Sequence, residues 1–210
     1  MRIVYLHGFA SSPHSSKARF FREKFRQIGV EMEIPALDGG DFEHLTVSSQ
    51  LEVVQRTVGD RPAVLMGSSL GGYLSALFAV RHPDLVQKLV LMAPAFGFPR
   101  RFQERYTEAD LAAWRLRGSA PVFHYGYGGE RNLGYGLMED AQKYEDNPDF
   151  RQPVLIFQGT GDPVVPVHLS EAFAASHPNA TLRLFASGHE LTDVLEPMWQ
   201  ATQAFLFQNL

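Results

Sequence analysis

The sequence predicts an α/β protein whose mainly parallel sheet of six strands has helices on both faces. Four short runs are apolar on both faces, as strands are in the interior of a parallel sheet that helices cover. They lie at 3–6, 63–66, 89–92 and 154–157. Two further runs, 30–34 and 182–185, alternate or nearly alternate between apolar and polar residues, which predicts half-exposed strands at the sheet edges. Strands and helical stretches alternate along the chain, and this alternation defines the α/β class.

Five stretches have the periodicity of amphipathic helices. They lie at about 16–28, 45–58, 70–81, 167–176 and 192–209. Glycine or proline follows most of the predicted strands, and the His-Pro pairs at 82–83 and 177–178 are typical of helix ends. These turn residues support the division of the chain into short elements.

The stretch at about 97–147, here called the cap, interrupts this alternation. It has no clear strand pattern, and aromatic residues alternate with glycine at 125–129. A structureless loop of this length is uncommon in a compact domain, so we expect an insertion with helices of its own. The whole chain of 210 residues is long enough for one domain and too short for two. We therefore predict a single domain, 1–210, that includes the cap.

The composition is that of an ordinary globular protein and excludes several chemistries. Apolar residues make up 45% and charged residues 20% of the chain, and the formal net charge of −4 disfavours nucleic acid and anionic membranes as partners. Without cysteine there is no disulfide, thiolate metal site or thiol nucleophile. No apolar run approaches the ~20 residues of a membrane span, and no secretion signal follows Met1, so a cytoplasmic location is expected.

The most specific motif is the run Gly-Ser-Ser-Leu-Gly-Gly at 67–72, directly after a buried strand and before a helical stretch. It matches the pattern G-x-S-x-G of a sharp turn that exposes a nucleophilic serine between a strand and a helix. Ser69 has glycines at both required positions and Ser68 does not, so Ser69 is the candidate nucleophile. The alternative is a glycine- and serine-rich turn that only connects the two elements.

A serine hydroxyl is a weak nucleophile at neutral pH and needs a base. Six of the eight histidines lie before prolines, in polar loops or at element ends, where capping or solvated positions are expected. They are His14, His44, His82, His124, His168 and His177. His189 instead follows the last strand and precedes the final helix, at the sheet edge where α/β active sites form. His189 is therefore the candidate base, and a loop histidine without a partner is the alternative.

The acid that orients the base is expected after a strand and between serine and histidine in chain order. Asp162 meets both conditions, and its carboxylate would fix the tautomer of His189 and stabilise the imidazolium. Asp193 and Glu190 lie close to His189 in the chain and are expected in the first turn of the final helix. For Asp162 the alternative is a turn or helix cap.

His7 also ends a strand, in His7-Gly8-Phe9, and its position suits a loop that stabilises an oxyanion. Acyl transfer places negative charge on the former carbonyl oxygen, where two backbone N–H groups should converge. One donor is the residue after the nucleophile, Leu70, and the other comes from this loop, at Phe9. A tight turn without such a role is the alternative.

Together, the segments 7–9, 67–72, 159–166 and 188–189 resemble the α/β-hydrolase superfamily along nearly the whole chain. The opening at 5–13, Tyr-Leu-His-Gly-Phe-Ala-Ser-Ser-Pro, is similar to small bacterial serine esterases that lack the first two strands of the superfamily. The resemblance implies a single-domain α/β-hydrolase fold with strand order 2-1-3-4-5-6, numbered along the chain. It also implies hydrolysis of carboxylic esters or thioesters through an acyl-enzyme by the triad Ser69, Asp162 and His189.

The cap is rich in aromatic residues that could cover an acyl or aromatic group. They are Phe98, Phe102, Tyr106, Trp114, Phe123, Tyr125, Tyr127 and Tyr135. We expect at least half of them to pack the cap onto the core, and we take Phe9, Phe98 and Trp114 as the candidate substrate-binding residues. Arginines at 100–117 could pair with an anionic leaving group, but interleaved acids at helical spacing favour a solvated, salt-bridged face.

Other functions stay open at this point. A carbon–carbon hydrolase or lyase could use the same triad, since some menaquinone-pathway members also have a His-Gly-Phe loop. An amidase or aminopeptidase would need an acid in the cap to hold the substrate amine, and a binding module would have lost the chemistry. The sequence has no HExxH, P-loop or dinucleotide motif, so we expect no metal and no cofactor, and a small acyl ester or thioester as substrate.

Overall fold

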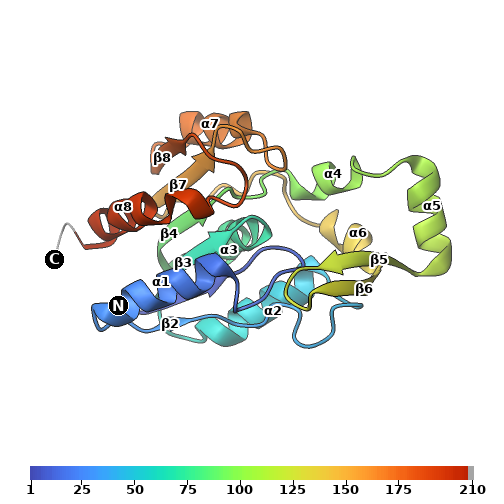
Figure 1. Cartoon of the computed structure of the whole chain (residues 1–210), viewed down its shortest axis with the longest axis horizontal. Coiled ribbons are helices and arrows are strands. Elements are labelled where there is room, and N and C mark those ends of the chain that lie inside the picture. Colours follow the sequence, from blue (N-terminus) through green and yellow to red (C-terminus); the bar gives the residue numbers. More distant parts are fainter. Residues whose placement is uncertain (208–210) are drawn as a thin grey trace.

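The computed structural model describes residues 1–207, and its main sheet has six strands in the order β2-β1-β3-β4-β7-β8 (Figure 1). The strands are β1 (Ile3–Leu6), β2 (Met32–Glu33), β3 (Ala63–Ser68), β4 (Val86–Met92), β7 (Val154–Gly159) and β8 (Ala180–Phe185). Neighbouring strands all run parallel. Every residue of β1, β3 and β7 is buried, whereas β2 and β8 keep exposed residues, as sheet edges do. Since β7 and β8 are the fifth and sixth strands of this sheet along the chain, the predicted order 2-1-3-4-5-6 and the predicted edges are confirmed.

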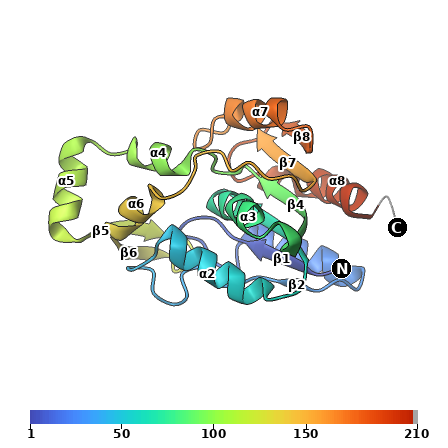
Figure 2. The same cartoon turned by 180° about the vertical axis from the view of Figure 1, so that it is seen from behind.

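Helices cover both faces of the sheet, as Figures 1 and 2 show from opposite sides. One face holds α1 (Ser16–Gln27) and α8 (Leu195–Phe207), and the other holds α2 (Val47–Val58), α3 (Leu70–Arg81) and α7 (Val167–Ser176). Two apolar clusters fill the space between these layers. Single-turn 3₁₀ helices, η1 (Pro83–Leu85) and η2 (Thr192–Val194), precede β4 and α8.

The helix boundaries follow local capping chemistry. The Ser15 side chain accepts from the Ala18 amide at the start of α1, and Thr46 and Ser49 form a capping box at the start of α2. The helix predicted at 192–209 is η2 followed by α8, and positions 208 and 209 lie outside the described residues. β2 is shorter than the predicted run 30–34, since only two of its residues pair with β1.

The cap elements lie together beside one end of the sheet, to the right in Figure 1. They include the expected helices, α4 (Phe98–Gln103), α5 (Glu108–Arg117) and α6 (Gly136–Ala141). The expectation that this stretch has no strand was wrong, because β5 (Ser119–His124) and β6 (Gly129–Gly134) pair as an antiparallel hairpin. Three of its aromatics, Phe123, Tyr125 and Tyr127, are exposed, so the hairpin lacks the apolar alternation that a buried strand needs. The limits of the cap at 97 and 147 stay a prediction.

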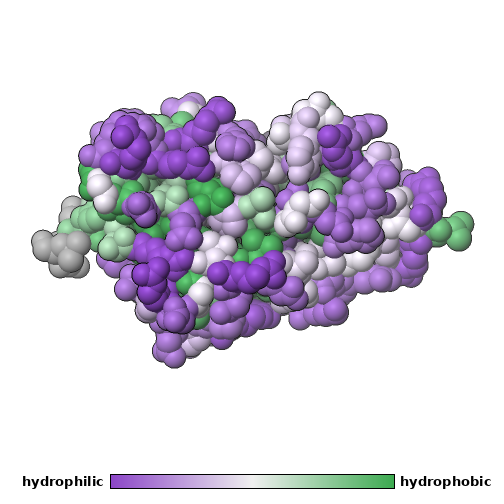
Figure 3. Space-filling view, turned by 90° about the horizontal axis from the view of Figure 1, so that it is seen from below, coloured by the Kyte–Doolittle hydropathy of each residue, from purple (hydrophilic) through white to green (hydrophobic). Residues whose placement is uncertain are grey.

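The outer surface has no continuous apolar face on the side drawn in Figure 3, where apolar residues form separate patches between hydrophilic ones. Within residues 1–207, no helix combines the length and the apolar character needed to cross a bilayer.

Candidate active site

Ser69 lies in the turn between β3 and α3, with φ +53° and ψ −117°. A non-glycine residue in such a conformation is strained, typically by about 1–3 kcal/mol, and persists only where its surroundings hold it. Close backbone packing does so here, because a Cβ on Gly67 would lie 2.3 Å from the Gly71 carbonyl oxygen. A Cβ on Gly71 would lie 2.1 Å from the Leu6 carbonyl oxygen. Both glycines are therefore required for this turn.

The structure brings the side chains of Ser69, Asp162 and His189 together, although 120 residues separate the first from the last. His189 Nε2 lies 3.1 Å from Ser69 Oγ, and His189 Nδ1 lies 2.8 Å from Asp162 Oδ2. All three follow β3, β7 or β8, whose carboxyl ends meet at one edge of the parallel sheet. A serine, an imidazole and a carboxylate in one chain of hydrogen bonds can perform nucleophilic catalysis.

The Asp162 carboxylate is fully buried and surrounded by donors. Its Oδ1 accepts from the amides of Val164 and Val165, both at 2.8 Å, and its Oδ2 accepts from His189 and from Gln158 Nε2 at 2.9 Å. Burial raises the pKa of Asp162, but the hydrogen bonds from His189, Val165 and Val164 outweigh burial and lower its pKa overall. The carboxylate is therefore ionised at neutral pH.

The charge of Asp162 determines where the protons lie in the hydrogen bonds that join Asp162, His189 and Ser69. A carboxylate can only accept, so Nδ1 of His189 donates to it, which leaves Nε2 of the neutral ring to accept from the Ser69 hydroxyl. This is the protonation state that a general base needs before nucleophilic attack.

The sequence did not single out Gln158, which donates to the Asp162 carboxylate. It is fully buried at the end of β7, donates also to the Val165 carbonyl, and accepts from the Ser170 hydroxyl at 2.9 Å. The feature that could have revealed it is a polar residue directly after four apolar ones in a buried strand.

The two rival acids have other partners. Asp193 accepts from the Ser187 hydroxyl, and its place in η2 agrees with the expected first turn of the final helical stretch. The Glu190 side chain is mostly exposed and lies 3.6 Å from Lys17 Nζ. In the structure, Asp162 is the acid that reaches the His189 ring.

Two other histidines are buried rather than solvated. His7 donates through Nδ1 to the Gly8 carbonyl and accepts through Nε2 from the Leu37 amide. Burial lowers the pKa of His7, so the ring is neutral and fixes the loop after β1. The expectation of a solvated His124 was wrong: it is 2% exposed, packs edge-on against Phe42, and accepts from the Tyr127 amide.

The loop after β1 passes beside Ser69. A Cβ on Gly8 would lie 3.5 Å from the Cβ of Ser69, so the backbone of Gly8 lies close to the turn that holds Ser69. Within residues 1–207, the amides of Phe9 and Leu70 have no hydrogen-bond acceptor. Two free N–H groups beside the serine are what an oxyanion site requires, and their role at Phe9 and Leu70 stays a prediction.

A cavity of about 920 Å³ opens above Ser69 and His189. Aromatic and aliphatic side chains from the cap and from the loop after β1 line one part of it. They are Phe9, Phe98, Phe102, Tyr106, Val122 and Phe123. The structure thus places Phe9 and Phe98 at the cavity, but it places Trp114 elsewhere. Trp114 is 2% exposed, and its Nε1 donates to the Leu133 carbonyl, so its role is to pack the cap.

Four of the arginines at 100–117 have two kinds of surroundings. Arg100 pairs with Glu104 at 2.9 Å and Arg115 lies 3.9 Å from Glu139, as expected for a salt-bridged face. Arg101 and Arg105 line the cavity, and Arg101 also donates to the Val164 carbonyl at 2.7 Å. Two of the five arginines at 100–117 therefore line this cavity.

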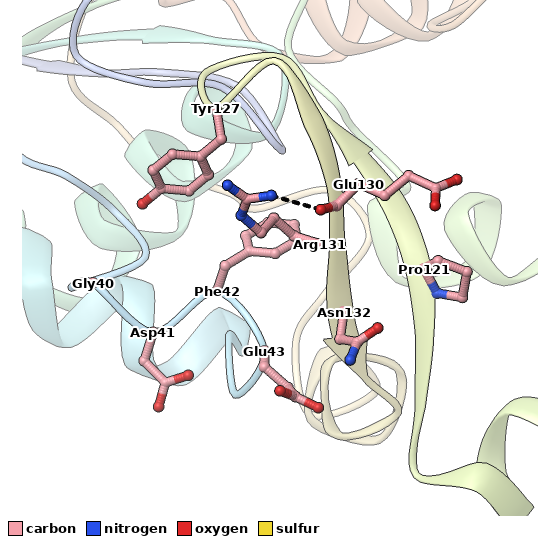
Figure 4. Close-up of a pocket in the computed structure, with 9 residues that line it drawn as sticks. All are labelled: Gly40, Asp41, Phe42, Glu43, Pro121, Tyr127, Glu130, Arg131 and Asn132. Atoms are coloured by element: carbon pink, nitrogen blue, oxygen red, sulfur yellow. Dashed lines mark hydrogen bonds between the residues drawn. The ribbon is translucent and has the colours of Figure 1, made fainter.

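A second cavity, of about 520 Å³, lies between the loop at 40–43 and the β5–β6 hairpin (Figure 4). Its charged lining residues are Asp41, Glu43, Glu130 and Arg131, and none of the three triad candidates borders it. Arg131 donates to the carbonyl of Glu130, whose carboxylate extends away from Arg131. Within residues 1–207, no group of three or more histidine or carboxylate side chains is placed to hold a metal ion. The candidate active site is therefore the larger cavity.

The fold has close counterparts among known structures. Alpha/beta hydrolase domain-containing protein 10 from mouse superposes with a TM-score of 0.79 at 21% identity, covering 97% of this chain and 88% of that one. Est1E from Butyrivibrio proteoclasticus superposes with a TM-score of 0.78 at 21% identity, covering 98% and 86%. Likeness at this identity defines the fold alone, and the fold is that of the α/β hydrolases.

Sequence comparison defines the family. The chain matches the model of the uncharacterised protein family UPF0227 over residues 2–206, and it belongs to that family. It is 34% identical to 2-hydroxy-6-oxononadienedioate/2-hydroxy-6-oxononatrienedioate hydrolase of Paraburkholderia phymatum, over 89% of this chain and 80% of that protein. It is also 25% identical to mitochondrial palmitoyl-protein thioesterase ABHD10 of Bos taurus, over 80% of this chain but only 59% of that protein.

Proposed function

We propose that this protein is a serine hydrolase that cleaves carboxylic esters, and thioesters, through an acyl-enzyme. The observation that supports this most strongly is the hydrogen-bonded chain from Ser69 through His189 to the buried Asp162. The neighbouring cavity, half apolar and open to Ser69, suits an acyl or aryl group. Relatives described as a thioesterase and a hydrolase are compatible with this class of reaction.

The reaction follows from the positions of these atoms. Ser69 Oγ attacks the carbonyl carbon and its proton passes to His189 Nε2, while the former carbonyl oxygen accepts from the amides of Phe9 and Leu70. The bond to the leaving oxygen or sulfur then breaks, and the imidazolium donates its proton to that atom. Water attacks the acyl-enzyme, His189 takes a proton from it, and Ser69 leaves with that proton. Asp162 stabilises the imidazolium both when the acyl-enzyme forms and when water cleaves it.

A carbon–carbon hydrolase is the second candidate, because the relative of highest coverage among those named above acts on a hydroxy-oxo-dienedioate. The triad and the cavity are compatible with both reactions. An aminopeptidase has less support, since the cavity-lining residues within 1–207 include no carboxylate from the cap that could hold a substrate amine.

Pre-steady-state hydrolysis of 4-nitrophenyl butyrate and of an acyl thioester tests the proposal. Because an acyl-enzyme releases the first product before water attacks, we expect a burst of 4-nitrophenol close to one per enzyme when deacylation is slow. His189→Ala should lower kcat by at least ~10³-fold, as removal of a triad base does. Turnover of the hydroxy-oxo-dienedioate, with neither ester nor thioester cleaved, would favour the second candidate.

A further inference from the structure

The cavity above Ser69 has a polar part that the proposed reaction does not use. It is formed by the start of α1, the end of β1 and the residue after His189. Its lining residues include Tyr5, Ser12, Ser15, Lys17, Arg19 and Glu190. The start of α1 contributes the amides of Ser16 and Lys17, which have no acceptor within residues 1–207, and the first turn of α1 contains no acid. This end of the helix offers N–H groups to the cavity without a side chain to neutralise them.

Tyr5 adds a second, independent observation. Its side chain is 0% exposed, it borders this part of the cavity, and its hydroxyl has no hydrogen-bond partner within the described chain. The hydroxyls of Ser15 and Ser68 are its polar neighbours, although neither completes a hydrogen bond with it. Burial raises the pKa of Tyr5 and outweighs the lowering by these two hydroxyls, so the group remains a phenol that can donate. A buried hydroxyl without a partner costs free energy, and a ligand oxygen in the cavity would supply the missing acceptor.

Lys17 places a positive charge in the same part of the cavity. It is 7% exposed, and its Nζ donates to the Glu190 main-chain carbonyl at 2.5 Å. Buried lysines are rare unless they are paired, and the nearest carboxylate is the mostly exposed Glu190, 3.6 Å away. Such an exposed partner is screened by solvent and neutralises the lysine only in part.

The other charged groups that line the cavity are also mostly cationic. Arg19 lies on α1, and Arg101 and Arg105 lie on the cap side. Against these three arginines and Lys17 stands one lining carboxylate, Glu190. Since Asp162 is shielded by its own donors, the field in the cavity favours an anion.

We infer that the start of α1, with Tyr5 and Lys17, forms an anion-binding subsite, which binds a carboxylate or phosphate group on the substrate and is separate from the amides of Phe9 and Leu70. This inference rests on the proposed function of the same cavity. The subsite lies on the histidine side of Ser69, since Lys17 Nζ donates to the residue directly after His189. The leaving group receives its proton from the histidine, so the anionic group belongs to the alcohol or thiol that leaves.

Three acetate esters with the same acyl group and the same aromatic ring test this subsite. They are 4-acetoxybenzoate, 4-acetoxyphenyl phosphate and the neutral 4-acetoxybenzamide. The measured quantity is the ratio of kcat/KM for each anionic ester to kcat/KM for the neutral one. Lys17→Met and Tyr5→Phe keep the shape of the buried side chains and should each lower this ratio about tenfold, the usual effect of losing one hydrogen bond to a charged group.

Matched controls separate the subsite from general effects of charge or packing. Lys24 lies on the same helix and pairs with Glu196 at 2.7 Å, and Lys24→Met should leave the ratio unchanged. Tyr73 is equally buried, but its hydroxyl donates to the Glu145 carbonyl, so Tyr73→Phe should also leave the ratio unchanged. Glu190→Gln removes the one lining carboxylate and should raise the ratio.

The outcomes distinguish the two proposals. If the wild type does not hydrolyse 4-acetoxybenzamide in a Ser69-dependent way, the proposed function fails. If it does, but the ratio responds equally to Lys17→Met and Lys24→Met, the subsite is absent. A preference for one of the two anionic esters identifies the group as carboxylate or phosphate. Glu190 is exposed, so we expect Glu190→Gln to fold normally, and a fall in its ratio would also contradict the subsite.

Discussion

The loops that follow the sheet strands and the cap that faces them differ in how their side chains are held. Asp162 is fully buried and accepts four hydrogen bonds, and Ser69 lies in a turn that two glycines make possible. In the cap, by contrast, Phe123 is 50% exposed and Tyr125 is 77% exposed. The groups proposed for the chemistry are therefore held by the sheet and its loops, whereas these cap side chains, which line the cavity, are held by fewer contacts.

The cap is nevertheless attached to the sheet layer at specific points. Asp140 in α6 accepts from the amide and the hydroxyl of Ser48 at the start of α2, both at 2.7 Å. The turn of the β5–β6 hairpin is attached to the loop after β1, since the Tyr125 amide donates to the Ala10 carbonyl at 2.8 Å. The first contact holds the cap against α2, and the second holds it against the loop that contains Phe9.

The largest effect is expected at the sheet edge. Asp162→Asn should lower kcat for a 4-nitrophenyl ester by ~10⁴-fold, because an amide in place of the acid stabilises the wrong histidine tautomer. Asp193→Asn is the matched control and should change kcat little, since Asp193 bonds to Ser187 instead. Steady-state kinetics of both variants check this, and an exchange of the two results would mean that the acid is Asp193.

A smaller effect, on stability, is expected where the cap meets α2. Asp140→Asn should lower the free energy of unfolding by about 2 kcal/mol at neutral pH, the scale of hydrogen bonds to a buried charged group. Burial raises the pKa of Asp140, but its hydrogen bonds with Lys143 and Ser48 lower its pKa overall. A carboxyl whose pKa is lower in the folded state stabilises above its unfolded pKa of ~3.9, and this stabilisation disappears as the pH falls through the folded pKa.

Urea unfolding at several pH values measures this contribution. The difference between wild type and Asp140→Asn should be constant from pH 7 to about pH 5 and shrink below the unfolded pKa of ~3.9. Asp149→Asn, at an exposed aspartate near the end of the cap, should show little difference at any pH. If the difference in free energy of unfolding between wild type and Asp140→Asn grew as the pH fell, this account of the contact would be contradicted.

The smallest of these effects concerns the residue behind the acid. Gln158→Met removes one donor to Asp162, and it should lower kcat about tenfold with KM unchanged, as the loss of one positioning hydrogen bond does. Gln152→Met is the control, since this buried glutamine donates to the carbonyls of Ala79 and Pro83 instead. Equal losses of kcat in both variants would assign Gln158 a structural role only.

The sequence predicted the sheet well and the cap poorly, for one physical reason. Strands such as β1 and β7 are buried on both faces, and burial leaves apolar runs between turn residues that can be recognised without a structure. Ser69 and Asp162 follow such strands, and His189 follows the edge strand β8, whose near alternation can also be recognised, so their positions could be predicted as well.

Sequence patterns carry no information about contacts between residues that lie far apart in the chain. The β5–β6 hairpin has exposed faces, so its strands leave no alternation to recognise. Trp114 and Phe98 are both cap aromatics in the sequence, and only packing decides that one fills the interior and the other borders the cavity. Lys17 resembles an ordinary helix-surface lysine until the fold places it beside the residue after His189.

The central claim is that Ser69 is the nucleophile of a preformed triad, and labelling by a fluorophosphonate probe tests it most directly. Mass spectrometry of the wild type should find one adduct per chain, on Ser69. The neighbouring Ser68→Ala variant should still be labelled, and folded Ser69→Ala should not be. Equal labelling of Ser69→Ala, or an adduct on any other residue of the wild type, would contradict the account.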